Sequence, residues 1–205
     1  DVDRAVASAR RAFEAGQWSQ ASPSQRKRVL QALAALLEQH ADELALLETL
    51  DMGKPVRDAR RVDLPGVVRC LRWTAEAVDK LYGDIAPTGP HELGLVSREP
   101  AGVVAAIVPW NFPLLMACWK IAPALAMGNS VVLKPSERSP LSALRLAALA
   151  AEAGLPDGVL NVLPGQGMYV GEPLALHMDV DVLAFTGSTA TGAKLLQYAG
   201  RSNLK

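Results

Sequence analysis

The chain has 205 residues, half of which are apolar, and its 21 basic and 21 acidic side chains give a formal net charge of zero. Such a chain can bury one sizeable core, but it lacks the basic patches of nucleic-acid-binding proteins and the lysine and arginine clusters that attract anionic membranes. Two cysteines without metal-site spacing, and no secretory signal pattern, predict free thiols in a cytoplasmic protein without a bound metal.

Residues 1–81 are predicted to form a layer of helices. Apolar residues recur at helical spacing over 1–14, and a long amphipathic pattern then runs from the capping sequence Ser22-Pro23-Ser24 to Met52. A further helix is predicted over 55–81, with a bend at Pro65.

Residues 82–100 change from a helical to an extended pattern. Residues 91–98 alternate in character and carry mixed chemistry on both faces. This pattern predicts a strand or hairpin that projects towards a partner.

From residue 101 onward, short apolar segments alternate with helical ones. Strands are predicted over 103–108, 130–133, 159–163 and 180–185. Helices are predicted over 114–127, over 141–153, near 171–177 and from 187 to 198. This alternation predicts an α/β fold with a parallel sheet covered by helices on both faces.

The uncharged stretch 100–119 is about as long as a bilayer requires. However, Pro109, Asn111 and Pro113 interrupt it and would free backbone groups that lipid cannot satisfy. We therefore expect a buried strand, a turn and a buried helix here, and no membrane contact.

Ligands of parallel α/β sheets bind beyond the carboxyl ends of the strands, which selects the loops 109–113, 134–137, 165–171 and 186–191. In the first loop, two prolines fix the backbone around Asn111. Its amide could donate to a developing oxyanion, or it could bond its own turn.

The other three loops also allow two interpretations each. Lys134 and Glu137 could grip the hydroxyls of a ribose, with the carboxylate repelling a 2′-phosphate, or form a solvated ion pair. The glycines of 165–171 are spaced one residue wider than the usual dinucleotide fingerprint, and a flexible turn would also explain them. The small residues of 187–189 could bind a phosphate or simply cap a helix.

Three loops taken together resemble a known family: Pro109-Trp110-Asn111-Phe112-Pro113, Lys134-Pro135-Ser136-Glu137 and Phe185-Thr186-Gly187-Ser188-Thr189. In this order and at these separations they are similar to the aldehyde dehydrogenase superfamily, and the resemblance covers essentially the whole chain. It implies a Rossmann-like NAD-binding core over 101–205, preceded by the N-terminal helical layer 1–81 and the extended segment 82–100.

The resemblance also implies roles for individual residues. Asn111 would be the side-chain half of an oxyanion hole, Lys120 would take part in a proton relay, and Glu137 would favour NAD over NADP. The aldehyde tunnel would be lined by Phe112, Met116 and Trp119. The cofactor would be bound by Val108, Pro109, Trp110, Lys134, Ser136, Glu137, Gly167, Gly171, Phe185, Thr186, Gly187, Ser188, Thr189, Thr191 and Gly192.

The implied activity is oxidation of an aldehyde to a carboxylic acid, with NAD as hydride acceptor, a cysteine thiolate as nucleophile and a glutamate as base. In that family both catalytic residues lie C-terminal to the Phe185 loop. We therefore expect a fragment without the catalytic domain, inactive by itself. Cys118 is expected to be a packing residue, and Cys70 has no partner that would activate it. A non-catalytic nucleotide-binding domain is the alternative.

Two phrases, 107–116 and 175–181, further resemble bacterial aminoaldehyde dehydrogenases of polyamine breakdown, which act on 4-guanidinobutyraldehyde or γ-glutamylaminobutyraldehyde. The complete protein is accordingly expected to act on a small aldehyde of this class. It is also expected to be a homodimer or homotetramer.

Overall fold

A four-stranded parallel sheet lies at the centre of the computed structural model, which describes residues 1–204. Its strands run in the order β5-β4-β3-β6. They are β3 (Val103–Ile107), β4 (Ser130–Lys134), β5 (Leu160–Val162) and β6 (Val182–Phe185). The predicted parallel sheet is confirmed, and every predicted strand is present within two residues at each end.

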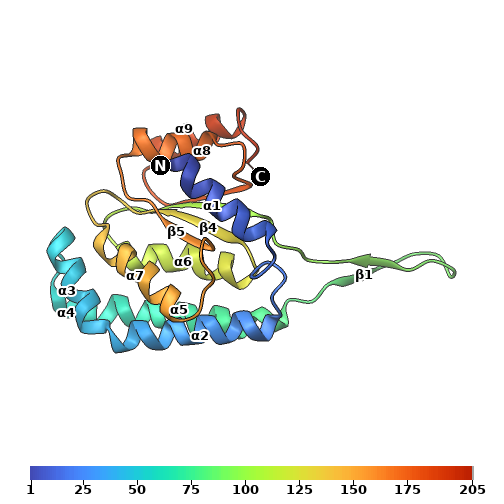
Figure 1. Cartoon of the computed structure of the whole chain (residues 1–205), viewed down its shortest axis with the longest axis horizontal. Coiled ribbons are helices and arrows are strands. Elements are labelled where there is room, and N and C mark those ends of the chain that lie inside the picture. The colour runs from blue at the N-terminus through green and yellow to red at the C-terminus, as the bar shows by residue number, and fades with distance from the viewer. Residues whose placement is uncertain (205) are drawn as a thin grey trace.

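Helices cover both faces of this sheet, as predicted (Figure 1). On one face lie α6 (Pro113–Ala126) and α7 (Leu141–Glu152), with α2 (Pro23–Gln39) and α5 (Leu64–Ala77) packed outside them. On the other lie α1 (Val2–Glu14), α8 (Glu172–Leu176) and α9 (Thr189–Ala199). The helix α1 packs there because Val2, Val6 and Ala9 form a core with the sheet residues Val103, Ala105 and Val132.

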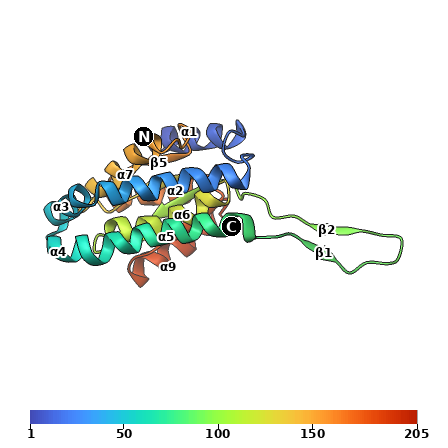
Figure 2. The same ribbon diagram turned by 90° about the horizontal axis from the view of Figure 1, so that it is seen from below.

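The long helical patterns are interrupted in the structure. The pattern predicted over 22–52 is two helices, α2 and α3 (Ala41–Met52), which meet at His40, and α3 ends at Gly53 in a left-handed conformation. The helix predicted over 55–81 consists of α4 (Val56–Asp58), a π-helical turn η1 (Ala59–Asp63), α5 and a 3₁₀ turn η2 (Val78–Lys80). The predicted interruption therefore falls just before Pro65. Figure 2 shows α2 and α5 side by side.

Residues 82–100 form an arm that extends away from the body (Figures 1 and 2). Strands β1 (Asp84–Ala86) and β2 (Gly94–Val96) pair antiparallel, with Ile85 opposite Leu95. The strand expected over 91–98 is thus only three residues long. Among residues 1–204, no helix is both long enough and apolar enough to span a bilayer.

Candidate functional site at the carboxyl edge of the sheet

The carboxyl ends of three strands meet at one edge of the sheet. Ile107, the last residue of β3, is in register with Lys134 at the end of β4 and with Phe185 at the end of β6. Backbone bonds continue past these ends, because Val108 N donates to Lys134 O at 3.2 Å and Thr186 N donates to Ile107 O at 3.1 Å. The first, second and fourth predicted loops therefore begin side by side.

Asn111 lies exposed in the loop between β3 and α6. Within residues 1–204 its side chain makes no hydrogen bond, so the amide is not used by its own turn as the alternative interpretation would require. Pro109 is half-buried before it, and Pro113 is buried as the first residue of α6. Ser139 Oγ donates to Trp110 O at 3.2 Å, which ties this loop to the one that follows β4.

Lys134 and Glu137 form a partly buried pair. The Lys134 side chain is almost fully buried, and its Nζ donates to Pro135 O at 2.9 Å and to Glu137 Oε2 at 3.5 Å. Burial lowers the pKa of Lys134, and the Glu137 carboxylate partly opposes this shift. The lysine of this pair is therefore buried, whereas the Glu137 carboxylate is partly exposed to solvent. Ser136 is buried, and its Oγ accepts a hydrogen bond from Arg138 N at 3.2 Å, so it shapes the turn.

A cavity of about 350 Å³ opens beside this pair. It is lined by Ile107, Lys134, Glu137, Gly167, Met168, Gly171, Glu172, Thr191, Lys194, Leu195 and Tyr198. Five of these are among the site residues predicted from the sequence, namely Lys134, Glu137, Gly167, Gly171 and Thr191. Sequence reasoning missed Lys194 and Tyr198, although both follow Thr191 at helical spacing on α9 and could have been found from that spacing.

The glycine-rich loop contains helical structure and is not a simple flexible turn. Residues Gly167–Gly171 form a π-helical segment, η3, that leads directly into α8. A side chain at Gly167 would meet no atom within 4 Å, whereas Gly171 is buried against Ile107 and Lys134. The wall of the cavity is therefore bare backbone at Gly167.

The loop after β6 places the start of α9 at the same edge. Ser188 caps the helix, which is one of the two roles considered for this loop, because its Oγ accepts a hydrogen bond from Thr191 N at 3.2 Å. The other amides of the first turn have no helical partner and remain available to an anion. A second cavity of about 740 Å³ lies beside them, lined in part by Phe185, Thr186, Gly187, Ser188, Thr189 and Gly192. A Cβ at Gly187 would lie 2.5 Å from the Phe185 ring, so a side chain there would displace this ring.

One face of α6 carries the predicted tunnel residues. Phe112 and Trp119 are exposed, and Met116 and Lys120 are half-buried. Burial lowers the pKa of Lys120. The Phe112 ring lies under the Lys54 ammonium group, whose Nζ is 4.0 Å from the ring centroid.

The two cysteines lie in the packed interior. Cys118 is fully buried on the opposite, core-facing side of α6, and burial raises its pKa well above the usual range for a thiol. Cys70 is half-buried, and burial raises its pKa as well. Because a nucleophilic cysteine needs an accessible thiolate, the expectation that Cys118 is a packing residue is confirmed.

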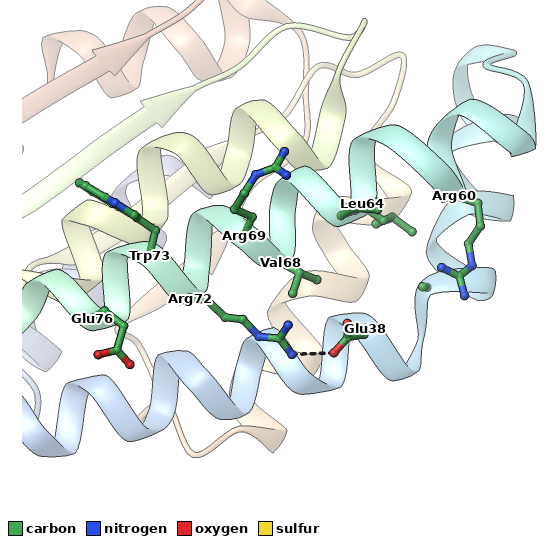
Figure 3. Close-up of a pocket in the computed structure, with 10 residues that line it drawn as sticks. Glu38, Arg60, Leu64, Val68, Arg69, Arg72, Trp73 and Glu76 are labelled. Atoms are coloured by element: carbon green, nitrogen blue, oxygen red, sulfur yellow. Dashed lines mark hydrogen bonds and ion pairs between the residues drawn. The ribbon is translucent and has the colours of Figure 1, made fainter.

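A further hollow of about 500 Å³ lies between α2 and α5 (Figure 3). Apolar residues such as Leu64 and Val68 form its floor, and Arg72 pairs with Glu38 across it at 2.6 Å. It contains no residue of the predicted site. Nor do residues 1–204 hold any cluster of three His, Cys, Asp or Glu side chains that could bind a metal ion.

Comparison with known proteins identifies the family. A family model described as the aldehyde dehydrogenase family matches residues 1–205. The chain belongs to the aldehyde dehydrogenase family. The fold agrees, since solved aldehyde dehydrogenase structures superpose on nearly all of it. One is the indole-3-acetaldehyde dehydrogenase AldA of P. syringae in complex with NAD⁺ and IAA, which is 65% identical with a TM-score of 0.97 and covers 99% of this chain.

Two other relatives are similarly close. The NADP/NAD-dependent aldehyde dehydrogenase PuuC of Escherichia coli is 63% identical over all 205 residues. The γ-glutamyl-γ-aminobutyraldehyde dehydrogenase of Burkholderia cenocepacia is 62% identical over 99% of this chain, with a TM-score of 0.97. The chain spans only 41% of the length of each of these three relatives.

Proposed function

We propose that the protein to which this chain belongs oxidises an aldehyde to a carboxylic acid with a nicotinamide dinucleotide, and that this chain supplies the dinucleotide cradle and one oxyanion donor. The observation that carries the proposal is the shared edge of the sheet. There the unbonded amide of Asn111, the buried Lys134–Glu137 pair and the start of α9 follow strands whose last residues are in register.

The residues at this edge fit a dinucleotide. Lys134 and Glu137 present a donor and an acceptor suited to the hydroxyls of a ribose. The first turn of α9 offers backbone amides to a pyrophosphate. Gly167 and Gly187 carry no side chains that would occupy the space of the dinucleotide. Bound NAD would supply the hydride acceptor. Val108, Pro109 and Trp110 lie at the end of β3, where they would flank the nicotinamide.

Glu137 is proposed to favour NAD over NADP, because its exposed carboxylate would repel a 2′-phosphate. The relative PuuC is described as NADP/NAD-dependent. The preference is therefore expected to be partial, and NADP remains a usable second cofactor.

Asn111 is proposed to donate its amide NH₂ to the oxygen that becomes negative when a nucleophile attacks the aldehyde. Lys120, two turns further along α6 and with a lowered pKa, is proposed to move a proton. The attacking thiolate is proposed to come from outside residues 1–205, because Cys118 is buried, Cys70 is half-buried, and burial raises the pKa of both thiols. The general base is proposed to lie outside these residues as well.

The proposed substrate is a small aminoaldehyde of the polyamine-breakdown type. Support comes from the γ-glutamyl-γ-aminobutyraldehyde dehydrogenase that is 62% identical to this chain. Phe112, Met116 and Trp119, on one face of α6, would provide part of an apolar tunnel for the alkyl chain.

The complete protein is proposed to be a homodimer or homotetramer in the cytoplasm. The arm of β1 and β2 supports the oligomer, because a two-stranded ribbon is marginal alone and its Ile85 and Leu95 side chains are about 70% exposed. Two free thiols suit a reducing compartment.

Replacing Asn111 tests the proposed activity. In the complete protein, Asn111→Ala should lower kcat for aldehyde oxidation by about 10²-fold, as expected for loss of one oxyanion donor, while the KM for NAD⁺ changes little. Steady-state measurement of NADH formation checks this result. An unchanged kcat would remove the oxyanion role, and no NAD⁺ reduction with any aldehyde by the wild type would remove the proposed activity.

A further inference from the structure

Glu48 of α3 is a buried carboxylate that contacts the start of α6. The residue is 1% exposed, and its Oε1 accepts a hydrogen bond from Leu114 N at 2.9 Å and lies 3.5 Å from Ser142 Oγ. The bond to Leu114 joins residues 66 positions apart in the sequence. It reaches the helix that begins immediately after the Asn111 loop.

The start of α6 cannot cap itself. Phe112 occupies the N-cap position and has no side-chain acceptor, and Pro113 at the first helical position has no N–H group. Leu114 N is therefore the first backbone donor of the helix, and Glu48 satisfies it from another element. Glu48 thus acts as the missing N-cap.

The same turn of α3 holds a second helix start. Asp51 Oδ2 accepts a hydrogen bond from Leu141 N at 2.7 Å, where Pro140 occupies the N-cap position of α7. Both α6 and α7 follow strands that end at the candidate site. A single turn of α3 therefore holds the first turns of both α6 and α7, each of which follows a loop of the candidate site.

The burial of Glu48 is costly. Its Oε2 is buried and has no hydrogen-bond partner within residues 1–204, and burial raises the pKa of the carboxyl group despite the bond from Leu114. A well-packed apolar side chain at such a position is often at least as stable. Because the buried carboxylate is costly, its presence suggests that the protein needs the position in which Glu48 holds the start of α6.

We propose that Glu48 is a positioning residue that holds the first turn of α6 and thereby aims the Asn111 amide. Only Phe112 and Pro113 separate Asn111 from the bonded Leu114, and the proline ring fixes its own φ. Little freedom therefore remains between the anchored amide and Asn111. This inference rests on the proposed oxyanion role of Asn111.

The test uses the complete protein and four variants: Glu48→Ala, Glu48→Asp, Glu48→Gln and the matched control Thr49→Val. Thr49 is the next residue of α3, and its Oγ1 donates only to Ala45 O of the same helix. Glu48→Ala removes the acceptor, and Glu48→Asp withdraws it by one methylene group. Both should lower kcat about tenfold or more, because small misplacements of catalytic groups are expensive. Glu48→Gln keeps an acceptor for Leu114 N and should retain most of kcat.

Measurements in the Asn111→Ala background separate positioning from general damage. If Glu48 acts through Asn111, Glu48→Asp should change kcat less than about twofold once the amide is gone. KM for NAD⁺ should stay within about twofold, and Thr49→Val should match the wild type in kcat and melting temperature. Glu48→Asp supplies the answer if Glu48→Ala does not fold.

Two results would overturn the inference while leaving the proposed activity intact. One is a wild-type kcat in Glu48→Asp when Asn111→Ala alone is strongly impaired. The other is an equal loss of kcat from Glu48→Asp with and without Asn111. If Asn111→Ala itself has no effect on kcat, the oxyanion assignment fails first.

Discussion

Glu137 extends from the carboxyl edge of β4 with nearly half of its side chain exposed, while the Lys134 ammonium group beside it is buried. The buried ammonium group holds one carboxylate oxygen, and Oε1 has no hydrogen bond within residues 1–204. In the proposed role, this oxygen would accept a ribose hydroxyl, and its charge would repel a phosphate at the same place. A single side chain would thus set the cofactor preference.

Neutralising Glu137 should relax that preference. In the complete protein, Glu137→Gln should lower the ratio of kcat/KM for NAD⁺ to that for NADP⁺ by roughly tenfold, which corresponds to about 1.4 kcal/mol. Steady-state kinetics with both cofactors measure the ratio. Glu152→Gln, an exposed carboxylate at the far end of α7, is the control and should leave the ratio unchanged. An unmoved ratio in Glu137→Gln would show that the carboxylate does not face the ribose.

Residues of the site differ in how far the sequence predicts them. Asn111, Lys134 and Glu137 were identified because they follow apolar strands directly, and carboxyl ends of parallel strands share an edge. Burial of the Lys134 side chain could not be predicted, because Gly171 of η3, which lies beside it, is distant in sequence. Glu48 was missed for the same reason, since its partner amide is 66 residues away.

At the scale of elements, the arm of β1 and β2 stands out because it buries almost none of its own apolar surface. Ile85 and Leu95 face each other across the ribbon and are 73% and 70% exposed. Exposed apolar pairs on an isolated ribbon are typical of a surface that another chain covers. A second copy of the protein is the proposed partner.

Charging this pair should break the assembly. The double variant Ile85→Lys/Leu95→Lys of the complete protein should have a lower mass in light scattering, because burying two lysines opposite each other costs more than the contact gains. His91→Lys, at the exposed tip of the arm, is the matched control and should keep the mass of the wild type. An unchanged mass in the double variant would mean that the arm does not hold the subunits together.

Elements bounded by glycine or proline were predicted closely, and others were not. Helix α7 begins after Pro140 and stops before Gly154, within one residue of its predicted end, and α3 ends at Gly53 as expected. The break between α2 and α3 falls at His40. No glycine or proline lies there, and the helical spacing of apolar residues continues on both sides. Leu44 and Ala45 of α3 join the same core as the apolar residues of α2.

At the scale of the whole molecule, the sheet lies between two sets of helices (Figure 1), and its strands β3, β4 and β6 end together at its carboxyl edge. The layers follow from apolar strands that must be covered on both faces, which is why the fold class could be predicted from the alternation of segments. The position of α1, on the opposite face from α2 and α5, could not be predicted, since an amphipathic helix does not specify its partner.

The central claim is that this edge binds a nicotinamide dinucleotide, and a crystal structure of the complete protein with NAD⁺ tests it most directly. The account predicts that a ribose lies within hydrogen-bond distance of Lys134 Nζ and a Glu137 carboxylate oxygen, with the pyrophosphate at the first turn of α9. Binding of the dinucleotide away from the ends of β3, β4 and β6 would contradict the account, as would a protein that does not bind NAD⁺.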